Sequence, residues 1–252
     1  MITESFDDKT TAIINPDSCY GKQDKICDIC IVTFSNIVVE NILKEFSCTQ
    51  IAAIVSANGN IPVFKFTYKG KEIAFYMTMI SSTGAGTCIE ESHCLIGATK
   101  YIMFGSCGTL DQAITAGKLI VPTHAYRDEG FSYHYAEAED YIEIRNAEKT
   151  ARIFEELDLP YVMGKIWTTD GIYRETSGNM EKRKSEGCIA VDMECAGVQA
   201  VCNFRKLEFY HFMISGDLLD APEWDRRILG SDEEVNYQLS NFYIAIELAT
   251  RI

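Results

Sequence analysis

Basic residues, prolines and long apolar runs are scarce in this sequence. Its 252 residues include only 5 Pro, and no linker, internal repeat or low-complexity tract divides the chain. No apolar run approaches the roughly 20 residues that a membrane-spanning helix needs, and residues 1–11 lack the basic start and apolar centre of a signal peptide. We therefore expect one domain spanning residues 1–252, located in the cytoplasm and without a membrane partner.

The scarcity of positive charge excludes one class of partner. The chain carries 23 Lys and Arg against 37 Asp and Glu, which gives a net charge of −14. Proteins bind DNA and RNA largely through cationic side chains that release counterions from the phosphates. We therefore expect no nucleic-acid partner, and any phosphate that the protein binds must be held by a locally arranged site.

Ten cysteines are present, but their distribution does not resemble a disulfide framework or a zinc finger. Most of them sit in apolar segments, which is typical of free buried thiols. Cys27 and Cys30 lack a second pair or a His at zinc-finger distance, and Cys188, Cys195 and Cys202 are spaced by sevens across a predicted strand and helix. We expect no metal site.

Short apolar runs that alternate with amphipathic segments predict an α/β fold. Residues 28–34 form a continuous β-rich run of the kind that is buried on both faces of a strand, and Ser35 or Asn36 can cap the helix after it. Residues 63–68 and 72–80 predict a hairpin. Further strands are predicted at residues 51–56, 100–104, 118–123, 161–168 and 209–214, and further helices at residues 88–99, 147–157, 180–186 and 233–250.

Residues 188–204 are the most informative stretch, because a short apolar strand runs straight into a helix. Asp192 occupies the expected N-cap position, and apolar residues from Met193 to Phe204 recur at helical spacing, so we predict a buried helix. Glu194 then lies in the first turn, where a buried carboxylate must be paired, hydrogen-bonded or available to a ligand. From periodicity alone, the favoured interpretation is that Glu194 is a second capping carboxylate beside Asp192.

Small or acidic residues follow three of the predicted strands. Residues 81–87 (SSTGAGT) and 105–108 (GSCG) are predicted loops, and residues 215–220 carry Asp217 and Asp220. Backbone N–H groups and hydroxyls at such junctions suit an anion or a sugar oxygen. Because α/β proteins bind ligands at the carboxyl edge of the sheet, we expect these segments to meet there.

Four segments together resemble the purine nucleoside phosphorylase and uridine phosphorylase superfamily. They are residues 191–197 (VDMECAG), residues 105–108, the Thr169-Asp170-x-x-Tyr173 segment and Ser215-x-Asp217, and they span almost the whole chain. The resemblance implies a single α/β domain with a mixed, partly barrel-like sheet flanked by helices, usually assembled as a homo-oligomer. It also implies cleavage of the N-glycosidic bond of a nucleoside, with no cofactor apart from inorganic phosphate as a possible co-substrate.

The resemblance implies that Glu194 and Met193 bind ribose. Glu194 would hold the 2′- and 3′-hydroxyls while Met193 packs on the sugar. As the base leaves, ribose acquires oxocarbenium character, so a carboxylate bound to its hydroxyls gains strength in the transition state. Glu194 is therefore a catalytic candidate as well as a ribose-binding one.

The resemblance also implies residues that contact the base. Asp217 would protonate or hydrogen-bond a purine at N7, and acid catalysis of this type contributes roughly 10²–10⁴ in rate. The inserted Gly216 departs from the family pattern and leaves Asp220 as the alternative acid. Ile172 and Tyr173 match the positions that stack on the base. The Gln and Arg with which uridine phosphorylases read uracil are missing after Tyr173, so a purine is favoured.

The phosphate site departs from the family pattern. Phosphorylases of this family usually carry an Arg after the first strand and another two residues before the GSCG segment, but residues 33–40 contain no Arg and the second position is Met103. Hydrogen bonds of about 1.5–3 kcal/mol each to a charged group are thereby lost. The remaining candidates for a phosphate or water site are Ser106, Ser82, Thr83, Gly84, Arg127 and Arg174.

Three functions therefore stay open. The family pattern favours a nucleoside phosphorylase, a pentosyltransferase of purine salvage that releases the free base and ribose 1-phosphate. The missing arginines favour a hydrolytic nucleosidase, in which water replaces phosphate. The third is a non-catalytic nucleoside-binding protein that kept the pocket and lost the chemistry.

Overall fold

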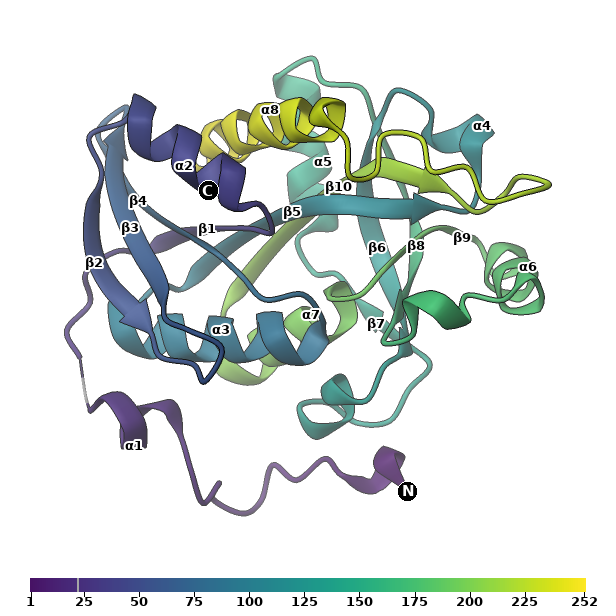
Figure 1. The fold of residues 1–252 in the computed structure, drawn as a ribbon. Coiled ribbons are helices and arrows are strands. Elements are labelled where there is room, and N and C mark those ends of the chain that lie inside the picture. Colours follow the sequence, from purple (N-terminus) through teal and green to yellow (C-terminus); the bar gives the residue numbers. More distant parts are fainter. Residues whose placement is uncertain (22) are drawn as a thin grey trace.

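A computed structural model of the protein describes residues 1–21 and 23–252. In this part of the chain, ten strands form one mixed sheet with helices on both sides (Figure 1). The strands are β1 (Ile29–Thr33), β2 (Thr49–Ile54), β3 (Ile61–Tyr68), β4 (Lys71–Met77), β5 (Lys100–Thr109), β6 (Leu119–Asp128), β7 (Tyr141–Glu143), β8 (Tyr161–Thr169), β9 (Cys188–Asp192) and β10 (Glu208–Leu218). The helices are α1 (Pro16–Tyr20), α2 (Asn36–Glu45), α3 (Ser82–Ile96), α4 (Gln112–Thr115), α5 (Ala147–Glu156), α6 (Ser177–Ser185), α7 (Cys195–Arg205) and α8 (Asp232–Ala249), with 3-10 turns η1 (Ile2–Glu4), η2 (Phe131–His134) and η3 (Ile172–Arg174).

Part of the sheet closes on itself into a small barrel. β5 pairs in parallel with β10, and the ring continues through antiparallel β6, parallel β8 and parallel β9, which returns to β5 as an antiparallel neighbour. β1, β4, β3 and β2 extend the sheet from β5. The expected α/β fold with a mixed, partly barrel-like sheet is confirmed. None of the helices in residues 1–21 and 23–252 has both the length and the apolar content that a bilayer crossing requires.

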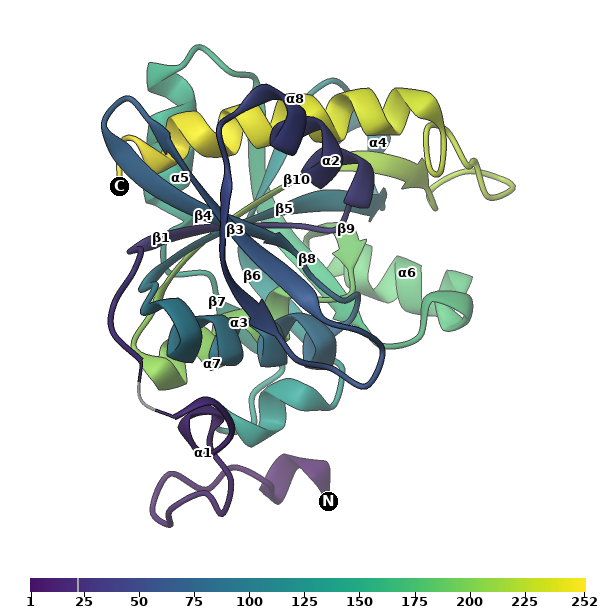
Figure 2. The same ribbon diagram turned by 60° about the vertical axis from the view of Figure 1, so that its left-hand side comes forward.

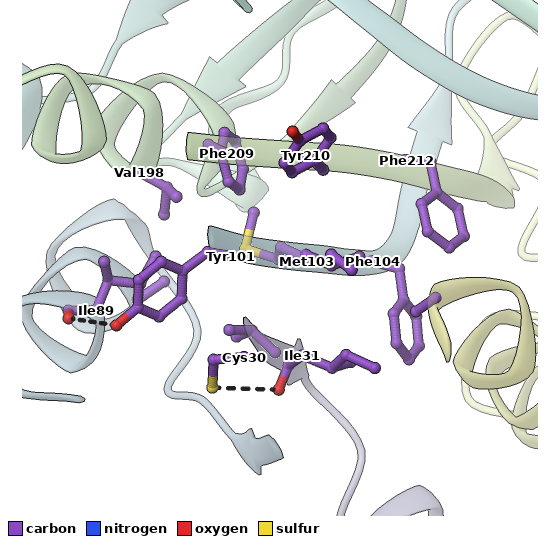
Figure 3. Close-up of a cluster of buried hydrophobic side chains, with 14 of the residues drawn as sticks. Cys30, Ile31, Ile89, Tyr101, Met103, Phe104, Val198, Phe209, Tyr210 and Phe212 are labelled. Atoms are coloured by element: carbon purple, nitrogen blue, oxygen red, sulfur yellow. Dashed lines mark hydrogen bonds between the residues drawn. The ribbon is translucent and has the colours of Figure 1, made fainter. Parts of the chain in front are cut away.

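The core lies between the sheet and two layers of helices. Figure 2 shows α3 and α7 below the sheet and α8 with α2 above it. Because both faces are covered, most residues of β1, β5 and β10 are buried. In Figure 3, the hydroxyl of Tyr101 donates to the carbonyl of Ile89 on α3 at 3.3 Å. Phe104 packs on Phe212 and on Phe242 of α8, with ring centroids 5.7 and 6.1 Å apart.

Close contact between α3 and α7 positions the start of both helices. A Cβ on Gly197 of α7 would lie 2.5 Å from the Cβ of Ser82 on α3, and a Cβ on Gly86 would lie 2.3 Å from the ring of Phe131. The hydroxyl of Ser82 donates to the Met193 carbonyl at 3.0 Å. Small residues in these positions therefore serve helix packing.

Two predicted loops belong to regular elements instead. Residues 81–87 were expected as a loop, but α3 begins at Ser82 because the Ser81 hydroxyl accepts a hydrogen bond from the N–H of Gly84 at 3.1 Å. Residues 105–108 lie inside β5, because β5 stays paired with β10 as far as Thr109. Small residues are poor indicators of a loop where two backbones approach closely.

We expect Gly197→Ala to destabilise the protein by about 1–3 kcal/mol, because the added methyl overpacks the contact with Ser82. Urea unfolding followed by circular dichroism measures the change. Gly178→Ala is the matched control: it lies on α6 with nothing within 4 Å of the added Cβ, so its stability should stay level or rise slightly. Equal stabilities for the two variants would contradict the proposed role of Gly197.

Candidate active site

A cavity of about 460 Å³ lies at the carboxyl ends of β1, β5, β9 and β10. Its wall is strongly acidic. No Lys, Arg or His of residues 1–21 and 23–252 contributes to this wall. Such a wall favours neutral or cationic ligands over anions. The carboxylates in the wall belong to Glu175, Asp192, Glu194, Asp217 and Glu234.

Glu194 lies at the N-cap position of α7 and is 8% exposed. One carboxylate oxygen accepts the N–H of Ser81 at 2.7 Å, and the other accepts the N–H of Met193 at 3.3 Å. Ser81 has a φ of 92°, a backbone conformation that persists in a non-glycine residue only where neighbouring contacts hold it. The carboxylate keeps unused lone pairs next to the cavity, since each oxygen accepts only one of these hydrogen bonds.

Asp192 caps α7 although it lies two residues before the N-cap position, because α7 begins later than we predicted. Asp192 is the last residue of β9, and Glu194 takes the N-cap position that we predicted for Asp192. The carboxylate of Asp192 nevertheless accepts hydrogen bonds from the N–H of Cys195 at 2.8 Å and from the N–H of Glu194 at 3.3 Å. It also accepts one from the hydroxyl of Thr168 at 2.6 Å. The capping function belongs to Asp192, which leaves Glu194 free for a ligand.

Burial changes the titration of this carboxylate pair. Loss of solvent is the main cause that raises the pKa of Glu194, and the neighbouring negative charge of Asp192 raises it further. Loss of solvent also raises the pKa of Asp192. A ligand that donates hydroxyl hydrogen bonds to Glu194 would stabilise its ionised form.

Asp217 lies in the cavity wall, whereas Asp220 does not. The indole N–H of Trp224 donates to the Asp217 carboxylate at 2.6 Å, and burial raises the pKa of Asp217. Asp220 forms an ion pair with Lys184 at 2.6 Å. Of the two alternative acids, only Asp217 is placed to meet a ligand in this cavity.

The inserted Gly216 is absorbed by a β-bulge. The register of β10 against β5 shifts between Ser215 and Asp217, so that Asp217 pairs with Gly108. A Cβ on Gly216 would lie 2.9 Å from the Cβ of Ser106, which explains why a glycine fits here. The bulge therefore keeps Asp217 at the cavity despite the extra residue.

The structure brings some of the other predicted residues together and separates the rest. Met193, Ser106 and Ile172 lie in the cavity wall, with Ile172 50% exposed. Tyr173 is 95% exposed and lies outside the wall, so its contact with a base stays a prediction. The remaining predicted residues outside the wall are Ser82, Thr83, Gly84, Arg127 and Arg174.

Arg127 lies outside the cavity wall and makes structural contacts, so its assignment as a substitute phosphate ligand stays a prediction. Its guanidinium is buried, donates to the Ser132 hydroxyl at 2.8 Å and to the carbonyls of Glu137 and Ala136, and stacks on the ring of Tyr133 at 4.1 Å. These contacts hold the segment after β6 in place. Arg174 is exposed and does not reach the wall.

Sequence reasoning missed three polar residues of the wall. Glu175 follows η3 and is half-buried; burial, with the charge of Asp217 as a second cause, raises its pKa to about 7. Glu234 and Gln238 both come from α8. For Glu234 and Gln238, the sequence offered one indication of a shared site: they lie one helical turn apart on the same face of a predicted helix.

Asp192, Cys195 and His211 form a buried cluster in which one ligand atom from each lies within 4.8 Å of the others. The Asp192 oxygens already accept hydrogen bonds from Cys195, Glu194 and Thr168. Burial raises the pKa of the Cys195 thiol well above its usual range, which opposes the thiolate that a metal requires. These residues fit a hydrogen-bonded core better than a metal site, and the absence of a metal site stays a prediction.

The family model described as the phosphorylase superfamily matches residues 28–249. A guanosine phosphorylase from Halorubrum lacusprofundi is 23% identical over 210 residues, which cover 82% of this chain and 78% of that protein. These matches confirm the resemblance read from the sequence motifs.

Many solved structures share the fold, and a nucleosidase and a futalosine hydrolase are among them. The 5′-methylthioadenosine/S-adenosyl homocysteine nucleosidase from Campylobacter jejuni has a TM-score of 0.71 and 18% identity, covering 90% of this chain and 100% of that one. A futalosine hydrolase mutant from Helicobacter pylori has a TM-score of 0.69 and 16% identity, covering 91% and 100%. At these identities the likeness concerns the fold alone.

We expect Asp217→Asn to lower the pKa of Glu175 from about 7, because the substitution removes a negative charge that disfavours ionisation of Glu175. A ¹³C NMR titration of the glutamate carboxyl groups measures the shift. Asp220→Asn is the control, since Asp220 pairs with Lys184 outside the cavity wall. An unchanged Glu175 titration in the Asp217 variant would show that the two groups are independent.

Proposed function

Because the chain belongs to the phosphorylase superfamily, we propose that it is a hydrolytic nucleosidase that cleaves the N-glycosidic bond of a purine nucleoside. The observation that carries the choice of water over phosphate is the acidic wall, to which no Lys or Arg in the described part of the chain contributes. A phosphate anion would meet only like charges and neutral donors there, whereas water is neutral. The proposal is supported by the contacts of Arg127, whose guanidinium donates to main-chain carbonyls outside the wall.

Glu194 is proposed to hold the 2′- and 3′-hydroxyls of ribose. Its two oxygens are oriented by the N–H groups of Ser81 and Met193 and still have lone pairs for the sugar. As the base departs, positive charge develops on the ribose ring. An ionised, buried carboxylate stabilises that charge more than it stabilises the ground state.

Asp217 is proposed to be the general acid. The C1′–N bond breaks with its electrons on the base, a proton passes from Asp217 to the purine, and the oxygen of water bonds to C1′ while its proton is returned to a carboxylate of the wall. Trp224 fixes the orientation of the Asp217 carboxyl group. Burial raises the pKa of Asp217, which increases the fraction of the protonated form that the step requires.

A nucleoside phosphorylase is the second candidate, because the guanosine phosphorylase relative matches most of the chain. Ser106 and the start of α2 lie in the same wall and offer hydroxyl and N–H donors to an anion.

We also propose that the protein forms a homo-oligomer, because a second copy would cover the exposed Ile172 and Tyr173 beside the cavity.

We expect base release from inosine, adenosine or guanosine to proceed at the same rate with and without inorganic phosphate, and the sugar product to be free ribose. Chromatography of the base and of the sugar product measures both. Uridine is the specificity control and should be cleaved more slowly. Stimulation by phosphate of about tenfold or more, with ribose 1-phosphate as product, would favour the phosphorylase; no cleavage under either condition would favour a binding protein.

We expect Glu194→Gln to lower kcat by about 10²–10³, because the charge that stabilises the transition state is lost. The stability of the variant separates this effect from misfolding. Since the folded-state pKa of Glu194 is raised, wild-type stability falls as pH rises through that pKa, and the variant should escape this loss. Thermal unfolding at pH 5 and pH 8.5 measures the difference; a variant that is inactive and less stable at both pH values would contradict the role given to Glu194.

A further inference from the structure

Three of the ten cysteines are accessible from solvent, and two of them belong to neighbouring helices. Cys19 on α1 is exposed, and Cys94 on α3 and Cys48 after α2 are half-buried. The other seven cysteines are buried, and buried thiols are inert because neither solvent nor a reagent reaches them. We therefore expect oxidation of the folded protein to be confined to these three thiols.

The thiol of Cys94 faces α1. Its Sγ atom lies 3.8 Å from the carbonyl oxygen of Gly21, which follows Cys19 by two residues. The N–H of Gly21 donates to the carbonyl of Asp17 at 2.9 Å and so closes the last turn of the helix that carries Cys19. Residues two positions apart on a helix have Cα atoms roughly 5 Å apart. A short movement of α1 therefore brings Cys19 and Cys94 to the Cα separation of about 4.4–6.8 Å that a disulfide requires.

The titration of Cys94 agrees with this proximity. Burial raises the pKa of the Cys94 thiol, and the negative charges of Asp17 and of an ionised Cys19 on α1 raise it further. The exposed Cys19 is therefore the better candidate for the first attack on an oxidant, and Cys94 for the second step.

The attachment of α1 to the rest of the protein allows such a movement. No residue of α1 is buried. The hydroxyl of Tyr20 donates to the Glu91 carboxylate of α3 at 2.8 Å and accepts the N–H of Val55 at 3.0 Å. Figures 1 and 2 both show α1 below α3. An element that is held by a few exposed hydrogen bonds and no buried apolar residue opens at a low cost in free energy.

We propose that Cys19 and Cys94 form a redox modification site, at which a small disulfide such as oxidised glutathione links α1 covalently to α3. The Cys19 thiolate attacks one sulfur of oxidised glutathione, which breaks its S–S bond and releases one glutathione thiolate. The Cys94 thiolate then attacks the Cys19 sulfur of the mixed disulfide and releases the second glutathione. Two protein thiols lose two electrons, both glutathione halves are reduced, and the two protons pass to the released thiolates. This site is independent of the proposed nucleosidase function.

The disulfide would hold the N-terminal segment on the body of the protein. It would also close a long loop in the unfolded chain, because 74 residues separate the two cysteines. Such a crosslink disfavours the unfolded state, so we expect oxidation to raise Tm by about 5–10 °C. Thermal unfolding of the oxidised and the reduced protein measures the difference.

The direct test is a peptide map of the oxidised protein. The folded protein is incubated with oxidised glutathione, its remaining thiols are blocked with N-ethylmaleimide, and the unfolded product is digested with trypsin and a glutamyl endopeptidase. Cleavage after Glu91 separates Cys94 from the buried Cys88. We expect mass spectrometry to show the Cys19 and Cys94 peptides joined, with two hydrogen atoms fewer than the separate peptides, in most molecules.

Serine variants assign the linkage. Cys19→Ser and Cys94→Ser should each abolish the joined peptide and the rise in Tm, while both variants unfold at the temperature of the parent in reducing buffer, since neither thiol is buried. Cys48→Ser is the matched control. Cys48 is the third accessible thiol, its Sγ atom contacts the Ile42 carbonyl at 3.9 Å, and its replacement should leave the joined peptide and the rise in Tm unchanged.

Two results would overturn the proposal. In the first, Cys19 stays a mixed disulfide with glutathione while Cys94 is recovered with the blocking reagent, so that the two thiols do not meet. In the second, Cys19 is joined to Cys48 or to a second chain, which non-reducing electrophoresis shows as a covalent dimer. Either result would leave the proposed nucleosidase function untouched, because both cysteines lie outside the catalytic wall.

Discussion

The hydrogen bond from the Ser81 N–H to the Glu194 carboxylate is the contact on which the site depends. It joins the residue before α3 to the residue before α7, two points that lie 113 residues apart in the sequence. The bond requires the close approach of the two helices at Gly197 and Ser82. A buried carboxylate is thereby fixed beside the cavity without being neutralised by a cation, a costly arrangement that is typical of functional sites.

The charge of the cavity wall sets the chemistry that the site can support. Glu175, Asp217 and Glu234 surround the same space as Glu194. Burial is the main cause that raises the pKa of Glu175, Asp217 and Glu194, and it favours their protonated forms. Protonated carboxyl groups can serve as acids, and ionised ones can stabilise a sugar that becomes cationic. The same wall is unfavourable for phosphate, and for this reason we propose water rather than phosphate as the nucleophile.

Sequence patterns located the carboxyl edge of the sheet correctly, because buried parallel strands leave continuous apolar runs and polar residues follow them. They failed where local composition has two explanations. The small residues at 81–87 serve the contact between α3 and α7, and residues 105–108 continue β5. The contacts of Arg127 were not foreseeable, because nothing in the sequence shows the carbonyls that its guanidinium binds after the chain folds back.

The sequence by itself determined the α/β class, the buried helix after β9 and the family to which the chain belongs, since these depend on local periodicity and short motifs. Only the tertiary structure decided that Asp217 and not Asp220 faces the cavity, because a β-bulge at Gly216 restores the register of β10. It also decided that Glu175, Glu234 and Gln238 join the wall. Their positions depend on how α8 and η3 pack around the barrel, and long-range packing leaves no local signal in the chain.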